Sequence, residues 1–253
     1  MAGQRFLAEG DSPPGARRMV YGRRRGPALS PHRRQLLAEL LPRIAYPVHA
    51  AGRIARPLAP FPHRRWRGLW LEIGFGAGEH LAAQAAAHPD IAVIGCEPYV
   101  NGVARLLSAI EAAALDNVRI WPDDARAVVE ALPDRCLGRV FMLFPDPWPK
   151  TRHHKRRLLG EPLLGELARV MRDGAELRLA SDDRGYCRWM LARLVGHPAF
   201  AWMTRAAYDW QRRPADWPQT RYEHKARAAG RGCVYLSFTR RRRRANSLKP
   251  AKN

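Results

Sequence analysis

Hydrophobic and polar positions change their pattern along this 253-residue chain at about residue 68. From there on, short apolar runs that end in Gly, Pro or acidic residues alternate with segments whose apolar positions recur at helical spacing. The apolar runs predict strands at residues 68–73, 91–96, 117–121, 138–143, 176–180 and 233–238. The segments with helical spacing predict helices at residues 79–88, 100–114, 125–131, 163–171 and 186–194.

Strands that alternate with helices over short connections predict an α/β fold with a doubly wound, mostly parallel sheet covered on both faces. Ligands of such sheets bind beyond the carboxyl ends of the strands. The residues that directly follow each strand are therefore the first candidates for a functional site.

The first 67 residues lack this alternation. Residues 1–35 are rich in Arg, Gly and Pro and predict a flexible basic arm, residues 31–44 predict a short helix, and residues 47–67 predict loops. We expect three parts: residues 1–67 as a basic arm with a short helix, residues 68–238 as the main domain, and residues 239–253 as a flexible basic tail.

Formal net charge is +21, and it is uneven: +11 in residues 1–67, +7 in residues 239–253 and +3 between them, of which residues 150–157 alone hold +5. Basic ends on a nearly neutral body indicate a polyanion partner, nucleic acid before membrane. Arg outnumbers Lys 39 to 5, which is also what a biased base composition of the gene produces. Such bias explains the excess of Arg over Lys, but it does not explain the excess of basic over acidic residues.

Several classes of protein do not fit the sequence. No apolar run approaches the ~18–20 residues that span a bilayer, and no signal peptide is recognised at the N-terminus. The cysteines, Cys96, Cys136, Cys187 and Cys233, lie far apart, which argues against a CxxC metal site or a disulfide framework. We expect a cytoplasmic protein with reduced thiols, no membrane and no metal.

Glycines at positions 74, 76 and 78 follow the first strand, after Glu72. They permit a tight turn and a close approach of ligand to backbone. The dinucleotide fingerprint GxGxxG fails because its last position is Glu79, a carboxylate that would repel a pyrophosphate, and there is no P-loop. GxGxG after an acidic residue is similar to the S-adenosylmethionine loop; the alternative is a glycine turn without a ligand.

Acidic residues also follow the second and third strands. Glu97 can accept hydrogen bonds from both hydroxyls of a ribose, or it is a solvated residue at a helix start. Asp124 can accept from the exocyclic amine of adenine, although one of Asp123 and Asp124 can instead cap the next helix.

The residues after the fourth strand, 144–157, read FPDPWPKTRHHKRR. Prolines on both sides of Asp146 and Trp148 stiffen the backbone, so these two side chains are suited to hold a planar base, with Trp148 stacked on it. The basic run can then bind phosphates. Adjacent histidines rarely chelate one ion together, so we expect no metal here. Polar residues, among them Asp182, follow the fifth strand, and residues 220–225 read as an amphiphilic loop.

Together these residues resemble the bacterial tRNA (guanine-N7-)-methyltransferase family, over roughly residues 17–238. The most specific block is residues 144–157; residues 71–80, 95–98, 101–103 and 220–223 and the arm residues 21–25 support it. The resemblance implies a seven-stranded Rossmann-like fold and transfer of a methyl group from S-adenosylmethionine to N7 of guanosine 46 in the variable loop of tRNA. A monomer or homodimer is expected.

By matching position, the resemblance implies roles for single residues. The expected cofactor-binding residues are Glu72, Gly74, Gly76, Gly78, Glu97, Asp124 and Asp146. Asp146 is also the expected catalytic residue, and the expected substrate-binding residues are Lys150, Asp182, Thr220, Arg221, Tyr222 and Glu223. Ala77 replaces a polar residue of many members, and residues 240–244 lie outside the family pattern, so their role is open.

The chemistry leaves the role of Asp146 open among three alternatives. Guanine N7 has a lone pair and no proton, so the enzyme has to position it rather than deprotonate it. Asp146 can stabilise the positive charge that develops on the base, accept from guanine N1–H and N2–H, or bind the cofactor amine. The two alternative functions are an amino-group methyltransferase on the same sheet and a basic RNA-binding protein without catalysis.

Overall fold

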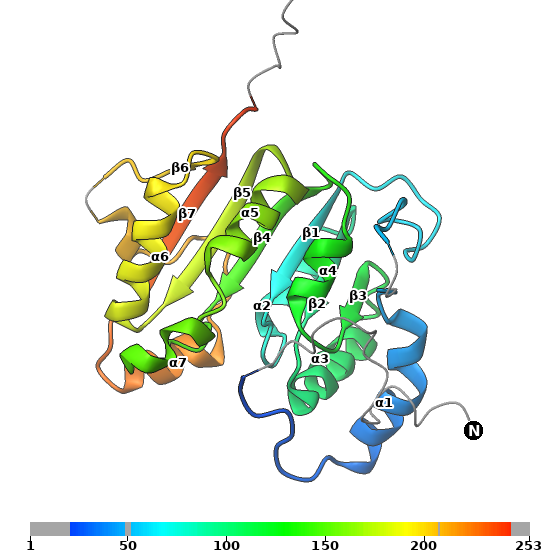
Figure 1. Cartoon of the computed structure of the whole chain (residues 1–253). Coiled ribbons are helices and arrows are strands. Elements are labelled where there is room, and N and C mark those ends of the chain that lie inside the picture. Colours follow the sequence, from blue (N-terminus) through cyan, green and yellow to red (C-terminus); the bar gives the residue numbers. More distant parts are fainter. Residues whose placement is uncertain (1–20, 49–51, 207, 244–253) are drawn as a thin grey trace, which may run out of the picture.

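A computed structural model of the protein describes residues 21–48, 52–206 and 208–243. Its sheet has seven strands in the order β3-β2-β1-β4-β5-β7-β6 (Figure 1). The strands are β1 (Gly68–Ile73), β2 (Ile91–Cys96), β3 (Val118–Trp121), β4 (Leu137–Leu143), β5 (Met171–Ser181), β6 (Phe200–Trp202) and β7 (Val234–Arg240). The α-helices are α1 (Pro31–Ile44), α2 (Glu79–Ala87), α3 (Val100–Ala112), α4 (Ala125–Ala131), α5 (Glu161–Val170), α6 (Arg184–Gly196) and α7 (Arg221–Ala228). Two short 3₁₀ helices are η2 (Thr151–Arg156) and η3 (Asp209–Gln211).

Strand pairing confirms the predicted fold class. From β3 through β5 all neighbours are parallel, while β7 runs antiparallel to both β5 and β6. In the registers of β1, Ile73 pairs with Cys96 of β2 and with Met142 of β4. The three central strands therefore end at the same level, and the loops that follow them start side by side.

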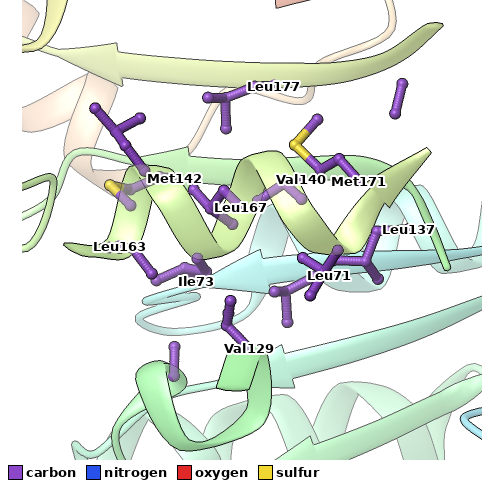
Figure 2. Packing of buried hydrophobic residues seen from close by; sticks show 14 of the residues in the cluster. Leu71, Ile73, Val129, Leu137, Val140, Met142, Leu163, Leu167, Met171 and Leu177 are labelled. Atoms are coloured by element: carbon purple, nitrogen blue, oxygen red, sulfur yellow. The ribbon is translucent and has the colours of Figure 1, made fainter. Parts of the chain in front are cut away.

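Two layers of helices cover the sheet, because its strands are apolar on both faces. Helices α4, α5 and α6 pack on one face, where Leu71 and Ile73 of β1 meet Val129 of α4 and Leu163 of α5 (Figure 2). Helices α1, α2, α3 and α7 pack on the other face, where Trp70 of β1 is buried. Alternate residues of β1 thus enter opposite cores.

Several elements differ from the prediction, among them the short 3₁₀ helices η2 and η3, which were not predicted. The segment predicted as a loop at residues 220–225 is the start of α7, and the three-residue edge strand β6 was not predicted. Met171, predicted as the last residue of a helix, is the first residue of β5.

The C-terminal tail starts later than predicted. Strand β7 continues to Arg240, and the guanidinium groups of Arg240 and Arg243 both donate to the carbonyl oxygen of Ala168, at 2.8 and 2.7 Å. They satisfy carbonyl groups that the last turn of α5 leaves unpaired. Because β7 is antiparallel to β5, these arginines lie at the amino edge of the parallel strands. The rest of the predicted tail, residues 244–253, lies outside the described residues.

Residues 21–30 of the predicted arm are held against the domain. The backbone N–H of Val100 donates to the carbonyl of Arg24 at 2.9 Å, and the N–H of Gly26 donates to Oδ1 of Asn101 at 2.7 Å. This segment, dark blue before α1 in Figure 1, therefore follows the start of α3. Residues 1–20 lie outside the described residues.

Candidate active site

The site is placed by the topology of the sheet. The chain leaves β1 toward β2 on one side, and β4 lies on the other side of β1, so the crevice of a doubly wound sheet opens at the carboxyl ends of β1 and β4. The pocket at this point is lined by Glu72, Gly74, His80, Phe144, Thr220 and Tyr222, among others. These residues come from β1, α2, the end of β4 and α7.

The glycine loop between β1 and α2 requires its glycines. Gly76 and Gly78 have φ angles of 58° and 83°, which side chains rarely adopt. A Cβ at Gly78 would lie 2.7 Å from the Leu106 side chain, and one at Gly76 would lie 2.8 Å from the Tyr222 ring. The loop therefore stays free of side chains at these two positions, and Tyr222 lies directly against it.

Glu97 is tied to this loop. Its carboxylate accepts from the backbone N–H of Gly76 at 2.7 Å and from that of Tyr99 at 3.0 Å. The residue is 8% exposed, and this burial raises the pKa of Glu97 to about 7. Each carboxylate oxygen has one N–H partner, which leaves lone pairs to accept further donors.

Glu72 forms a buried pair that the sequence did not indicate. Its Oε2 lies 2.7 Å from Nδ1 of His80, and both residues are almost fully buried. The His80 ring makes edge contacts with Phe141 and Trp217, with centroids 4.6 and 5.6 Å apart. His80 therefore fixes the Glu72 side chain at the end of β1.

Asp124 caps helix α4, the alternative role that was open to one of Asp123 and Asp124. Oδ1 of Asp124 accepts from the N–H of Arg126 at 2.9 Å at the start of α4, and both carboxylate oxygens bind the Arg126 guanidinium. Asp123 is the more exposed of the two and forms an ion pair with Arg24 of the N-terminal segment. Contact between Asp124 and a ligand remains a proposal.

The loop after β4 is strained and fixed. Phe144 and Trp148 have φ angles of 51° and 43°, unusual for residues with side chains. Nε of Arg157 donates to the carbonyl of Pro147 at 2.8 Å. Asp146 is exposed, yet partial desolvation by the surrounding protein raises the pKa of its carboxyl group. The loop thus presents Asp146 and Trp148 in set positions.

The predicted substrate-binding residues have different environments. Lys150 is exposed at the start of η2, and Asp182 pairs with Arg231 at 2.8 Å. Thr220 caps α7 by accepting from the N–H of Glu223 at 3.2 Å.

Within α7, exposure separates the predicted residues. Arg221 and Tyr222 are exposed, whereas Glu223 is 1% exposed and pairs with Arg213 and Arg227 at 3.3 and 2.9 Å. The Glu223 side chain therefore fastens α7 to the domain and presents no surface to a substrate.

The structure brings most of the predicted residues together. The carboxylates of Asp146 and Glu72 are close enough to Glu97 to raise its pKa further. Burial raises the pKa of Tyr222, and the nearby carboxylates of Glu97 and Asp146 raise it further. Among the residues that the structure describes, no cluster of three or more potential metal ligands occurs, and none of the helices is long and apolar enough to cross a bilayer.

Comparisons with known proteins agree with this geometry. Residues 67–236 match the family model described as "Putative methyltransferase". The tRNA (guanine-N(7)-)-methyltransferase of Rhodospirillum rubrum is 52% identical over 228 residues, 89% of each chain. The protein with the same name from Paramagnetospirillum magneticum is 47% identical and covers 93% of this chain and 98% of its own.

Among solved structures, PH0851 superposes with a TM-score of 0.51 at 14% identity, over 70% of this chain and 43% of that one. This likeness concerns the fold alone. The family follows from the sequence match, which covers two thirds of the chain, and from the close relatives. The chain belongs to this methyltransferase family, and the tRNA (guanine-N(7)-)-methyltransferases of these bacteria are its relatives.

Proposed function

We propose that this protein transfers a methyl group from S-adenosylmethionine to N7 of a guanosine in tRNA, at position 46 of the variable loop. The names of its close relatives support the reaction. The observation that carries the proposal is the position of Asp146 and Trp148, on a fixed loop beside the glycine loop and Glu97. A base held by Asp146 and Trp148 would lie next to a cofactor held by the glycine loop and Glu97.

The residues at the ends of β1 and β2 fit this cofactor. The glycine loop leaves no room for side chains at Gly76 and Gly78. Glu97 offers a buried carboxylate with free lone pairs for ribose hydroxyls, and Glu72 can face the cationic amino group. S-adenosylmethionine, when bound, supplies an electrophilic methyl group on a sulfonium. Asp124 stands at the end of β3, where the adenine would lie.

The residues of the chain then have to position the base and balance its charge. N7 of guanine attacks with its own lone pair, so no side chain needs to remove a proton. The strained backbone at Phe144 and Trp148 keeps Asp146 in place before the substrate arrives. A carboxylate held there favours the positive charge that appears on the purine. Acceptance of guanine N1–H and N2–H by Asp146 is compatible with the same position.

Exposed cations lie on the two elements that follow the carboxyl ends of β4 and β5. Lys150, Arg152 and Lys155 are exposed around η2, and Arg184 and Arg188 are on α6. Within the described part of the chain, none of these five forms an ion pair with an acidic side chain. Unpaired cations around a base-binding site are what phosphate groups of RNA require. We therefore assign them to the tRNA backbone.

The experiment uses the full chain, unmodified tRNA and S-adenosylmethionine labelled on its methyl group. Aniline treatment after chemical reduction breaks RNA at 7-methylguanosine, so scission at position 46 identifies both the base and the position. A tRNA with adenosine at position 46 should take up no label. Label without scission would contradict N7 transfer and favour an amino-group methyltransferase.

Asp146→Asn tests the role of the carboxylate in the same assay. We expect a loss in kcat of about 100-fold or more, with cofactor affinity nearly unchanged, because a fixed charge at the reacting base is removed. Glu39→Gln, which neutralises an exposed carboxylate on α1, is the matched control. Full turnover of Asp146→Asn would remove the catalytic assignment.

A further inference from the structure

Two aromatic rings from distant parts of the chain form a corner beside Asp146. Tyr21, in the N-terminal segment, and Trp148, after β4, lie edge to face with ring centroids 6.0 Å apart and planes at 71°. Both rings are partly exposed. A Cβ placed on Gly22 would be 3.5 Å from Oδ2 of Asp146, so the segment that carries Tyr21 passes directly beside this carboxylate.

The corner already holds a planar cation. Cζ of Arg156 lies 4.8 Å from the centroid of Tyr21 and 4.9 Å from that of Trp148, within the range of a cation–π contact to both rings. Nε of Arg156 is buried without a hydrogen-bond partner, and no acidic side chain in the described ranges pairs with its guanidinium. In the described residues, the guanidinium of Arg156 is therefore held by its contacts with the rings of Tyr21 and Trp148.

The segment that carries Tyr21 is anchored well enough to act as a wall. The guanidinium of Arg24 forms an ion pair with Asp123, and the backbone carbonyl of Arg24 accepts from the N–H of Val100 at 2.9 Å. Gly26 is so tightly packed that a Cβ there would lie 2.1 Å from the hydroxyl oxygen of Tyr99. Tyr21 is therefore part of the site. The basic charge of the N-terminal arm gave no indication that an aromatic residue of the arm lies there.

We propose that Tyr21, Trp148 and Asp146 form a receptor for a positively charged purine, so that the site binds 7-methylguanine more tightly than guanine. The inference rests on the proposed function and adds that the site recognises the positive charge of the methylated base. When N7 uses its lone pair to bond to the methyl carbon, the former S–C bonding pair stays on sulfur and the positive charge passes to the purine. No proton moves in this step.

The two aromatic faces and the carboxylate attract that charge as it develops, so they stabilise the transition state more than the neutral substrate. The Arg156 guanidinium marks the place of the cation when RNA is absent. A phosphate of bound RNA provides the acceptor that Arg156 lacks, and the base then occupies the corner. Tyr21 and Trp148 thereby contact the reacting base directly.

Calorimetric titration of the full-length protein with 7-methylguanosine 5′-monophosphate and with guanosine 5′-monophosphate tests the proposal, both with S-adenosylhomocysteine present. We expect the methylated nucleotide to bind about three- to tenfold more tightly, an effect between that of an exposed and that of a fully desolvated cation–π contact. Tyr21→Phe should keep this preference, and Tyr21→Ala and Trp148→Ala should reduce it. Tyr208→Ala, which removes an exposed ring elsewhere, is the control.

Equal affinity for the two nucleotides would overturn the proposal, as would a preference that survives both Tyr21→Ala and Trp148→Ala. Tyr21 lies outside helices and strands, so an unchanged melting temperature of Tyr21→Ala separates a lost contact from misfolding. The outcome is distinct from that of the methyl-transfer assay. Methyl transfer to tRNA without a preference for the methylated nucleotide would support the proposed function and contradict the receptor. A preference for the methylated nucleotide without methyl transfer would support the receptor and contradict the proposed function.

Discussion

At the scale of single residues, Glu97 gives the clearest pH dependence. Burial raises its pKa to about 7, and ribose hydroxyls need its ionised form as an acceptor. Cofactor affinity should therefore fall about tenfold between pH 8 and pH 6, as the ionised fraction falls. Titration of the protein with S-adenosylhomocysteine at several pH values measures this, together with a release of protons on binding near pH 7.

The sign for stability is opposite. A carboxyl group whose pKa is raised by folding contributes stability below its unfolded pKa, and this contribution is lost as pH rises through about 7. Glu97→Gln should remove both effects, since the amide does not titrate. A Glu97→Gln protein with the original pH dependence of cofactor binding would assign the effect to another group, such as Asp146, whose pKa is also raised.

Residues that directly follow strands could be predicted, because parallel strands end at one edge and place their next residues together. Glu97 and Asp146 were found in this way. His80 could not be found, because a histidine in the first turn of α2 gives no signal until the fold places it against Glu72. Glu223 was assigned to substrate on family position alone, and only the structure shows its carboxylate turned into the protein.

At the scale of elements, the contact between α3 and the glycine loop depends on Gly102. A Cβ at this position would lie 2.1 Å from the carbonyl oxygen of Gly76. Gly102→Ala should therefore push the loop away and lower the free energy of unfolding by about 1–3 kcal/mol, as overpacking does. Urea unfolding measures the loss, and a cofactor titration should show weaker binding.

Gly165→Ala is the matched control within α5, where an added Cβ meets no atom within 4 Å. The same substitution there should raise the free energy of unfolding by about 0.4–1 kcal/mol, because alanine restricts the unfolded chain. If the two substitutions changed the free energy of unfolding equally, crowding between residue 102 and Gly76 would not explain the need for glycine at position 102.

The elements of the central sheet could be predicted because each is a short apolar run followed by glycine, proline or acid. Helix α7 has a charged sequence with few buried positions, so hydrophobic spacing does not reveal it. Its capping box, Thr220 with Glu223 three residues later, was the available signal. Strand β6 has three residues, too few for a periodicity, and exists because β7 provides an edge to pair with.

At the scale of the whole molecule, the two edges of the sheet differ in how their arginines are paired. At the amino edge, Arg53, Arg64 and Arg67 pair with aspartates that precede β4, β3 and β2. Arg240 and Arg243 of the predicted basic tail also lie at this edge and bind backbone carbonyls. These cations serve the fold, so a count of basic residues overestimates the charge available to RNA.

At the carboxyl edge, the cations near the site are free to bind phosphates. The triple variant Lys150→Gln, Arg152→Gln, Lys155→Gln should weaken tRNA binding and reduce the slope of log K against log salt by about 2–3, nearly one unit per phosphate contact. Filter binding of tRNA from about 50 to 200 mM salt measures the slope.

A second triple variant, Arg53→Gln, Arg64→Gln, Arg67→Gln, removes the same net charge from the amino edge and makes the comparison decisive. If total charge attracted tRNA, both variants would lose the same slope, since long-range attraction depends on the sum of charges. If the free cations beside the site bind phosphates, only the first variant loses slope, and the second keeps its affinity while its melting temperature falls. Equal slopes for the two variants would contradict the assignment of residues 150–155 to the tRNA backbone.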